Sequence, residues 1–420
     1  MIFEGFVEAE SILLWAAFAL AIVLGAAANK TNFCTMGAVS DWVNMGDLSR
    51  IRAWLLAIAV ATLGVVIFES MGLVDAGGSF PPYRATELIW AENILGGLLF
   101  GIGMTLASGC GNKTLVRIGG GNFKSIVVMA VIGVIAYFMT NPFPDSDKTL
   151  FSVLFYDWIR PLSISTVSGQ DLGNLLNADN AVMTRLVVGV VLALAILVFV
   201  FKSADFRSSR DNILGGLIVG LVVFGGWYVS SNVQVNVEDE MYSLGSYYGE
   251  WDMVAESEEG KPAVGAPLSP QSFTFVNPMG QTFGYVKGGV ERSMVTFGIM
   301  ALLGVIVGSF LWSLVSKSLR FEWFASVKDF VTHMVGAVLM GFGGVLALGC
   351  TIGQGITGVS TLAVGSFLAL FAIVFGSAIT MKIQYYKLVY EEEASFVKAL
   401  VAGLADMKLL PNSLRKLDAV

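Results

Sequence analysis

Charge is scarce in this sequence of 420 residues. Only 14% of the residues are charged, whereas 55% are hydrophobic and the mean hydropathy is +0.73. Soluble domains carry about 25% charged residues, so a large soluble fold is excluded. The net charge of −7 also excludes a nucleic-acid partner, because such partners require a surplus of lysine and arginine. We therefore expect an integral membrane protein that lies in a lipid bilayer.

Histidine and cysteine are also rare. The chain has one histidine, His333, and three cysteines, Cys34, Cys110 and Cys350. Their spacing does not match a zinc site, and an odd number of cysteines in apolar segments does not favour a disulfide framework. A free cysteine is most often a small buried hydrophobe. We expect no metal and no cofactor.

Long apolar runs are what the sequence has in abundance. Nine runs have the length of about 17–25 residues that a helix needs to cross a bilayer. Glu4, Glu8 and Glu10 precede the first run, where a cleavable signal peptide would need basic residues, so we expect this run to stay in the membrane. The runs cover residues 12–29, 52–72, 92–108, 125–140, 183–201, 212–230, 293–315, 332–348 and 360–380.

Lysine and arginine gather in every second connection between these runs. Basic residues follow the first, third, fifth, seventh and ninth runs, and they include Lys30, Lys113, Lys202, Lys317 and Lys382. Short cytoplasmic loops of membrane proteins are enriched in positive charge. We therefore expect the N-terminus outside the cell and the C-terminus in the cytoplasm.

A pattern of glycines with one cysteine occurs twice. The stretches 93–110 and 333–350, aligned with an offset of 240, are identical at eight of eighteen positions, and both end in glycine followed by cysteine. By the charge pattern, the first copy crosses inward and the second crosses outward. Two copies of one motif that cross in opposite directions form an inverted repeat, as in many secondary transporters.

The predicted fold class is an all-α polytopic membrane protein with about nine transmembrane helices, short re-entrant helices and an inverted internal repeat of pseudo-twofold symmetry. Glycine pairs at 97 and 101, 216 and 220, and 304 and 308 predict close helix packing. The expected organisation is a first membrane repeat at 1–140, an external loop at 141–182, membrane helices opening the second repeat at 183–230, an acidic external loop or insertion at 231–292, the remainder of the second membrane repeat at 293–381, and a cytoplasmic tail at 382–420.

The residues after each Gly-Cys pair are too polar and too rich in glycine for a lipid-facing helix. Broken backbone at membrane depth is tolerated only inside protein or beside a cavity, so we expect 110–118 and 350–358 to be re-entrant turns or half-helices. Their free N–H groups would favour an anion, and a neutral thiol can donate a weak hydrogen bond without trapping it. Lys113 adds positive charge, although it also fits an ordinary cytoplasmic loop. The candidate residues of the substrate path are Cys34, Cys110, Cys350, Gly109, Gly111, Asn112, Lys113, Thr114, Gly349, Thr351 and Gln354.

Three motifs resemble those of one known family, the YeeE/YedE family of membrane proteins. They are TNFCTMGAVSDW at 31–42, ASGCGNKTLVRIGGGN at 107–122 and LGCTIGQGITG at 348–358. The resemblance implies thiosulfate uptake across a bacterial inner membrane through a fold with inverted pseudo-symmetry. It also implies that Cys34, Cys110 and Cys350 pass the ion on through S–H hydrogen bonds, and that a cytoplasmic sulfur-carrier or rhodanese-like protein is a partner. This chain departs from the family pattern because the third pore cysteine expected in its second half is absent and because 231–292 reads as an insertion.

Two other classes of function remain as alternatives. A membrane sulfurtransferase or redox protein would carry a persulfide on Cys110 or Cys34, which requires a reactive thiolate, but no acid–base pair accompanies Cys110. A structural subunit would anchor a cytoplasmic partner and transport nothing. Another sulfur compound, or a selenium compound, is the alternative substrate. The sequence thus predicts a transporter, with no catalytic residues, for a small sulfur-containing anion, and thiosulfate is the preferred candidate substrate.

Overall fold

The computed structural model describes residues 1–254 and 260–417, and in these ranges it is a bundle of helices. Nine of the helices described there are long and apolar enough to cross a membrane, which confirms the predicted number and the all-α polytopic class. They are α1 (Phe6–Lys30), α3 (Ser49–Ser70), α4 (Trp90–Leu106), α6 (Phe123–Thr140), α9 (Ala181–Phe201), α11 (Arg210–Asn232), α15 (Phe297–Val315), α16 (Val327–Leu346) and α17 (Val364–Val389).

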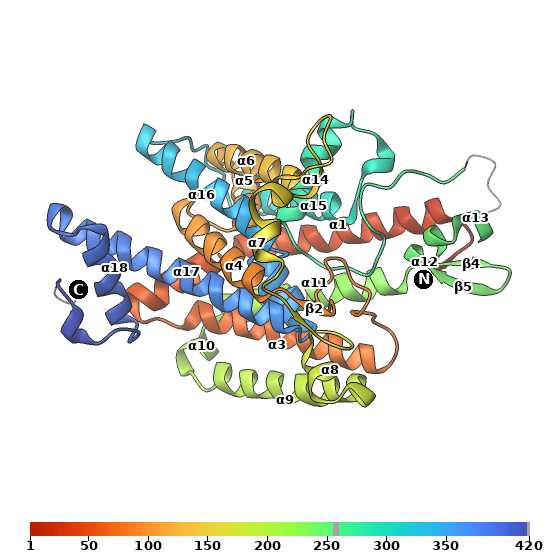
Figure 1. Cartoon of the computed structure of the whole chain (residues 1–420), viewed down its shortest axis with the longest axis horizontal. Helices are drawn as coiled ribbons and strands as arrows, with labels where there is room; N and C mark the ends of the chain where they lie inside the picture. The colour runs from red at the N-terminus through yellow and green to blue at the C-terminus, as the bar shows by residue number, and fades with distance from the viewer. Residues whose placement is uncertain (255–259, 418–420) are drawn as a thin grey trace.

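The long helices lie roughly along the long axis of the molecule, and the two termini lie at opposite ends (Figure 1). We call the end with the N-terminus the N-side and the end with the C-terminus the C-side. Residues 255–259, part of the acidic segment, and 418–420, part of the predicted tail, lie outside the described residues.

Shorter elements connect the long helices. In the first half they are β1 (Ile2–Phe3), α2 (Thr35–Ser40), η1 (Asp41–Met45), β2 (Glu87–Leu88), α5 (Gly111–Gly119), η2 (Ser152–Tyr156), α7 (Asp157–Ile159), β3 (Ile164–Ser165), α8 (Leu172–Leu176) and η3 (Ala178–Asn180). In the second half they are α10 (Ala204–Ser208), β4 (Gln234–Val237), β5 (Glu240–Ser243), α12 (Leu244–Gly249), α13 (Trp251–Val254), α14 (Val276–Lys287), η4 (Arg292–Met294), η5 (Gly353–Gly358), η6 (Glu391–Glu393), α18 (Phe396–Asp406) and η7 (Asn412–Leu414).

Two small sheets accompany the helix bundle. Strand β1 pairs in parallel with β4, which pairs antiparallel with β5, and β2 pairs antiparallel with β3. The first sheet, with α12 and α13, extends beyond the helices on the N-side (Figure 1). Phe6 at the start of α1 packs on Tyr247 and Trp251 of this extension, at ring-centroid distances of 5.9 and 5.5 Å.

The three glycine pairs predicted from the sequence lie where helices cross. A Cβ atom at any of the six positions would collide with a backbone carbonyl oxygen of a neighbouring helix, on α17 for the first pair, α3 for the second and α1 for the third. Small residues let helix backbones approach closely in a membrane, where no hydrophobic effect drives helices together. The glycines therefore set the spacing of the bundle.

The crossing of α4 and α16 carries the signature of an inverted repeat. A Cβ on Gly96 would lie 2.8 Å from the Gly343 oxygen, and one on Gly336 would lie 2.7 Å from the Gly103 oxygen. Gly96 and Gly336 are equivalent under the offset of 240, and so are Gly103 and Gly343. One contact is thus repeated with the roles of the two helices exchanged, as a twofold axis requires.

Helix α4 and the short helix α5 together cross the bundle from the N-side to the C-side. Asn93 near the start of α4 lies against Gly365, at the N-side start of α17. Beyond α5, the Arg320 N–H donates to the Gly120 oxygen at 3.0 Å, in the C-side connection between α15 and α16. The break between α4 and α5 at Cys110 thus divides one crossing into two half-helices.

Helix α16 and the helical turns that follow it cross in the opposite direction. Helix α16 begins on the C-side, where Lys124 pairs with Asp329 at 3.2 Å. The second half-helix, residues 351–360, ends on the N-side, where the Leu172 N–H donates to the Leu362 oxygen at 3.1 Å. Most of this half-helix is the π-helical η5.

Two further segments are re-entrant, one from each side. Residues 271–287 enter from the N-side beside Ser230, whose Oγ accepts from the Gln271 N–H at 2.9 Å, and return there as α14, where Lys287 reaches the Tyr137 hydroxyl at 3.4 Å. Residues 31–45 enter from the C-side after α1 and return as α2 and η1 before α3 begins. Short re-entrant helices were predicted, but α14 was assigned to an external loop.

The remaining long helix, α9, lies outside the helix pairs that the inverted repeat relates to each other. Helix α1 packs along α15 and α11 packs along α3, which is again one arrangement with the roles exchanged. Helix α9 packs mainly on α3, and only Arg185, Gly189, Ala193 and Val200 are buried along it. On the C-side, α18 packs on the end of α17, where Lys382 pairs with Asp406 at 3.2 Å.

Candidate functional site

The same backbone turn precedes both half-helix cysteines. Ser108 and Leu348 each adopt a left-handed φ of +58°. The N–H groups of Gly109 and Gly349 then close the turns by donating to carbonyl oxygens five residues back, at 2.8 Å in both copies. A non-glycine residue seldom adopts this φ, so the surrounding packing must hold the turn. The turn places Cys110 and Cys350 at the N-terminal ends of the two half-helices.

The two half-helices meet near the centre of the bundle and bring the cysteines together. A Cβ built on Gly111 lies 3.8 Å from the Cβ of Cys350. The thiol of Cys110 lies near both Cys34 and Cys350 and faces the Thr351 side chain. Gly111 and Thr351 are equivalent under the offset, so each cysteine faces the residue that follows the other cysteine. All three cysteines are free and buried, with exposed fractions of 5%, 2% and 0% along the sequence.

Backbone N–H groups point at the Cys350 sulfur. The Gly353 N–H donates to its Sγ at 3.5 Å, and the N–H groups of Ile352 and Phe275 also point at it. These donors engage the lone pairs of the sulfur. The S–H group therefore remains available to donate a hydrogen bond to another group. The hydroxyl of Thr274, at the tip of the N-side re-entrant segment, faces the same sulfur.

Positive charge lies on the C-side of the cysteines. The Lys113 ammonium donates to Asn32 Oδ1 at 2.6 Å and has no carboxylate partner among the residues that the structure describes. Arg50 pairs with Asp41 at 2.6 Å and lies beside Cys34, where the surrounding side chains leave no space for a water molecule. The potential around Cys34 is therefore positive.

A recess on the N-side reaches the turn before Cys350. It measures about 260 Å³ and extends from Glu87 and Arg160 to Leu348, two residues before the cysteine. The nearby Tyr83 is only 2% exposed, and its hydroxyl has no hydrogen-bond partner in the described part of the chain. Burial, with a smaller contribution from the neighbouring Cys350, raises the pKa of Tyr83, so the hydroxyl stays protonated and can donate.

Four other predicted path residues are buried at this junction. Asn112 Oδ1, Thr351 Oγ1 and Gln354 Oε1 have no hydrogen-bond partner among the described side chains and backbone groups. Thr114 differs, because its hydroxyl donates to the Cys110 oxygen at 3.0 Å and is not free for a ligand. Gln354 Nε2 likewise donates to the backbone oxygen of Ala347.

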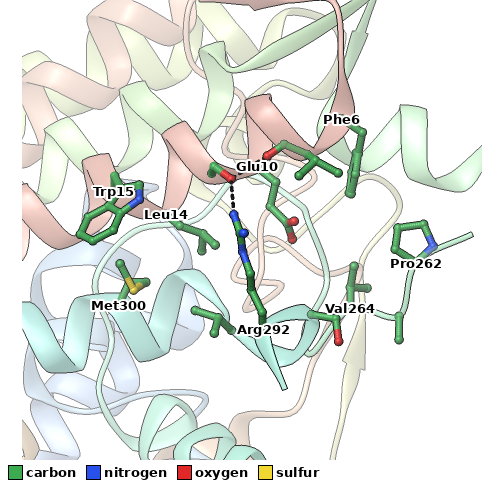
Figure 2. Close-up of a pocket in the computed structure, with 13 residues that line it drawn as sticks. Phe6, Glu10, Leu14, Trp15, Pro262, Val264, Arg292 and Met300 are labelled. Atoms are coloured by element: carbon green, nitrogen blue, oxygen red, sulfur yellow. Dashed lines mark hydrogen bonds between the residues drawn. The ribbon is translucent and has the colours of Figure 1, made fainter. Parts of the chain in front are cut away.

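Other parts of the molecule fit a ligand site less well. Within residues 1–254 and 260–417, no group of three or more histidine, cysteine or acidic residues could hold a metal ion. His333 instead pairs with Asp329 at 3.0 Å on the C-side. A recess of about 650 Å³ between α1 and the start of α15 is lined by Trp15, Met300 and other apolar residues, with Arg292 bonded to the hydroxyl of Ser11 (Figure 2). No cysteine lines it.

Three residues at the junction were missed in the sequence analysis. Tyr83 lies in a connection between spans, Thr274 in the acidic segment and Trp227 in a transmembrane helix, and none belongs to a Gly-Cys motif. The one available signal was the apolar stretch SFTFVNPMG at 272–280, which stands out within an acidic segment.

A membrane transport protein is the class that this arrangement defines: broken and re-entrant helices of an inverted repeat meet around buried polar groups. A family model described as "Sulphur transport" matches residues 30–379, so the chain belongs to that family, and the predicted YeeE/YedE membership is confirmed. The chain is a transport protein and not an enzyme.

Two relatives narrow the comparison. The chain is 24% identical over 346 residues to the protein named "Thiosulfate transporter TsuA" of Escherichia coli strain K12. The aligned region covers 80% of this chain and 84% of the relative. It is 21% identical over 374 residues to the protein of the same name from Spirochaeta thermophila. That aligned region covers 87% of this chain and 97% of the relative.

Proposed function

We propose that this protein carries thiosulfate into a bacterial cell across the inner membrane. The observation that supports this most directly is the meeting of Cys110 and Cys350, one from each repeat, at the N-terminal ends of two half-helices. The positive end of a helix dipole at an N-terminus favours an anion, and broken helices frame the substrate sites of many secondary transporters. The names of the two relatives supply the substrate.

The proposed path passes through the N-side recess, Cys350, Cys110 and Cys34 to the C-side. Each thiol donates an S–H hydrogen bond to the anion and keeps its proton, because a thiolate would repel the anion. A thiol is a weaker donor than a hydroxyl or an ammonium group, so each station releases the ion to the next. The positive charge of Lys113, which no carboxylate neutralises among the described residues, draws the ion toward the C-side.

The C-side is the cytoplasmic side in this proposal, which places the N-terminus outside. Support comes from the basic residues at the C-side ends of the crossings. A cytoplasmic sulfur-carrier or rhodanese-like protein would receive the ion there. Residues 141–182 and most of 231–292 would then face the outside, with α14 dipping into the membrane.

Uptake of ³⁵S-labelled thiosulfate into proteoliposomes tests the proposal. We expect Cys110→Ala and Cys350→Ala to lower the initial rate more than about tenfold, because each removes a hydrogen bond to a charged ligand. The matched Cys110→Ser and Cys350→Ser variants keep a donor and should retain more activity than the alanine variants. Undiminished uptake in both alanine variants would remove the thiols from the mechanism. Absence of uptake by the wild type would refute the substrate.

A further inference from the structure

We propose that Thr274 and Tyr83 form an additional binding station on the N-side of Cys350, where their hydroxyl groups hold the oxygen atoms of the transported anion. The proposal rests on the transport function proposed above. It assigns to Thr274 the place for which the second repeat has no cysteine.

The inverted repeat makes Thr274 the positional counterpart of Cys34. Cys34 lies at the tip of the C-side re-entrant segment, as the residue that caps α2, and neighbours Cys110. Thr274 lies at the tip of the N-side re-entrant segment, one residue before the cap of α14, and faces Cys350. The two tips thus contact equivalent cysteines. One tip presents a thiol and the other presents a hydroxyl.

The polar atoms at this tip are donors without partners. Thr274 is 8% exposed, Tyr83 2% and Trp227 0%, and apart from the Cys350 sulfur that Thr274 faces, Thr274 Oγ1, the Tyr83 hydroxyl and Trp227 Nε1 have no hydrogen-bond partner in residues 1–254 and 260–417. A buried polar group without a partner destabilises a fold, so three of them together need an explanation. A ligand that accepts their hydrogen bonds supplies one.

The chemistry of these groups indicates an anion. An indole N–H only donates, and a protonated tyrosine or threonine hydroxyl donates readily, so the set matches an acceptor-rich ligand and not a cation. The Tyr83 and Trp227 rings lie 6.3 Å apart, and Thr274 Oγ1 lies 3.3 Å from a Cβ built on Gly349. Thr274 therefore lies at the turn that presents Cys350, and Trp227 lies beside Tyr83, which neighbours Cys350. Neutral donors can hold an oxyanion without trapping it, as conduction requires.

The test uses substitutions that change the hydroxyl and little else. Thr274→Val and Tyr83→Phe should each raise the KM for thiosulfate uptake about 10- to 100-fold, the loss expected when a hydrogen bond to a charged ligand is removed. Thr274→Ser and Thr274→Cys keep a donor and should stay within about threefold of wild type, well inside that range. Thr332→Val, an exposed hydroxyl that bonds within its own helix, and Tyr228→Phe serve as matched controls.

A structural role makes a different prediction. Loss of an unpartnered hydroxyl should leave the midpoint of SDS-induced unfolding unchanged or higher for Thr274→Val. A wild-type KM in Thr274→Val and Tyr83→Phe would overturn the proposal. A lower unfolding midpoint with equal KM changes in the Val, Ser and Cys variants would also overturn it. If Cys350→Ala is impaired while Thr274→Val is normal, only this inference fails. If the wild type shows no uptake, the proposed function itself fails.

Discussion

A cysteine at position 111 should form a disulfide with Cys350. In the folded protein a Cβ on Gly111 lies 3.8 Å from the Cβ of Cys350, and its other near neighbours, Met279 and Phe275, lie no closer than 3.7 Å. The separation equals the mean of about 3.8 Å found in disulfides, and the contacts are ordinary van der Waals distances, so the new side chain needs no extra room. The bond would join the two half-helices across the pseudo-twofold axis.

The experiment is cleanest in a background that retains only the two thiols in question. Cys34→Ala and Cys110→Ala remove the others, and mild oxidation of purified protein should then protect both remaining thiols from a maleimide reagent that is added after denaturation, because Cys350 is buried in the folded protein. Gly109→Cys in the same background is the control, because its Cβ faces the side chains of Lys113 and Arg117. Gly111→Cys in the otherwise native chain should lose uptake on oxidation and regain it with dithiothreitol. Two reactive thiols after oxidation would contradict the meeting of the half-helices.

Two further predictions concern stability. Gly343→Ala places a Cβ 2.6 Å from a carbonyl oxygen of α4 and should lower the free energy of SDS-induced unfolding by about 1–3 kcal/mol, whereas Gly249→Ala, with no atom within 4 Å, should change it by less than about 0.5 kcal/mol; equal effects would refute the close crossing. Asp171→Asn should cost about 3 kcal/mol at pH 7, because it breaks a buried pair with Arg185 at 3.1 Å. Burial alone would raise the pKa of Asp171, but Arg84 and Arg185 with a backbone N–H hold it below its usual value, so the contribution is complete above about pH 4 and is lost as the pH falls through the depressed pKa. A difference between the two proteins that changes between pH 5 and 8 would contradict this assignment.

The number of spans and the inverted repeat were readable from the sequence because both depend on local, repeated patterns. Apolar length gives the spans, and glycines that must fit against another backbone recur at equivalent positions, as Gly96 and Gly336 do. The ends of the helices were less accurate. Helix α1 begins at Phe6, before the predicted 12, because Glu10 faces a recess that also holds Arg292.

The N-side half of the junction could not be predicted, for a physical reason. Residues 271–287 return to the side from which they enter. Their helix, α14, is too short to cross a membrane, so the segment gives no apolar run of transmembrane length. Pro278, which would disfavour the interior of a helix, is tolerated because it lies in the first turn of α14. Side chains such as Tyr83 reach the junction through tertiary packing alone. Cys110 and Cys350 were found because they repeat, and Thr274 was missed because its counterpart Cys34 is a different residue.

The solitary helix α9 has a topological consequence. Helices α1, α3, α4 and α6 make an even number of crossings, with the broken α4–α5 counted once, so the chain leaves the first unit on the face where it entered. A tandem copy attached there would insert in the same sense as the first. One additional crossing reverses the membrane orientation of every helix after it. The number of crossings, more than any contact that α9 makes, therefore inverts the duplicated unit. Its sequence can therefore drift while its presence cannot be dispensed with: removal of this single span would deliver Cys350 to the membrane from the wrong face.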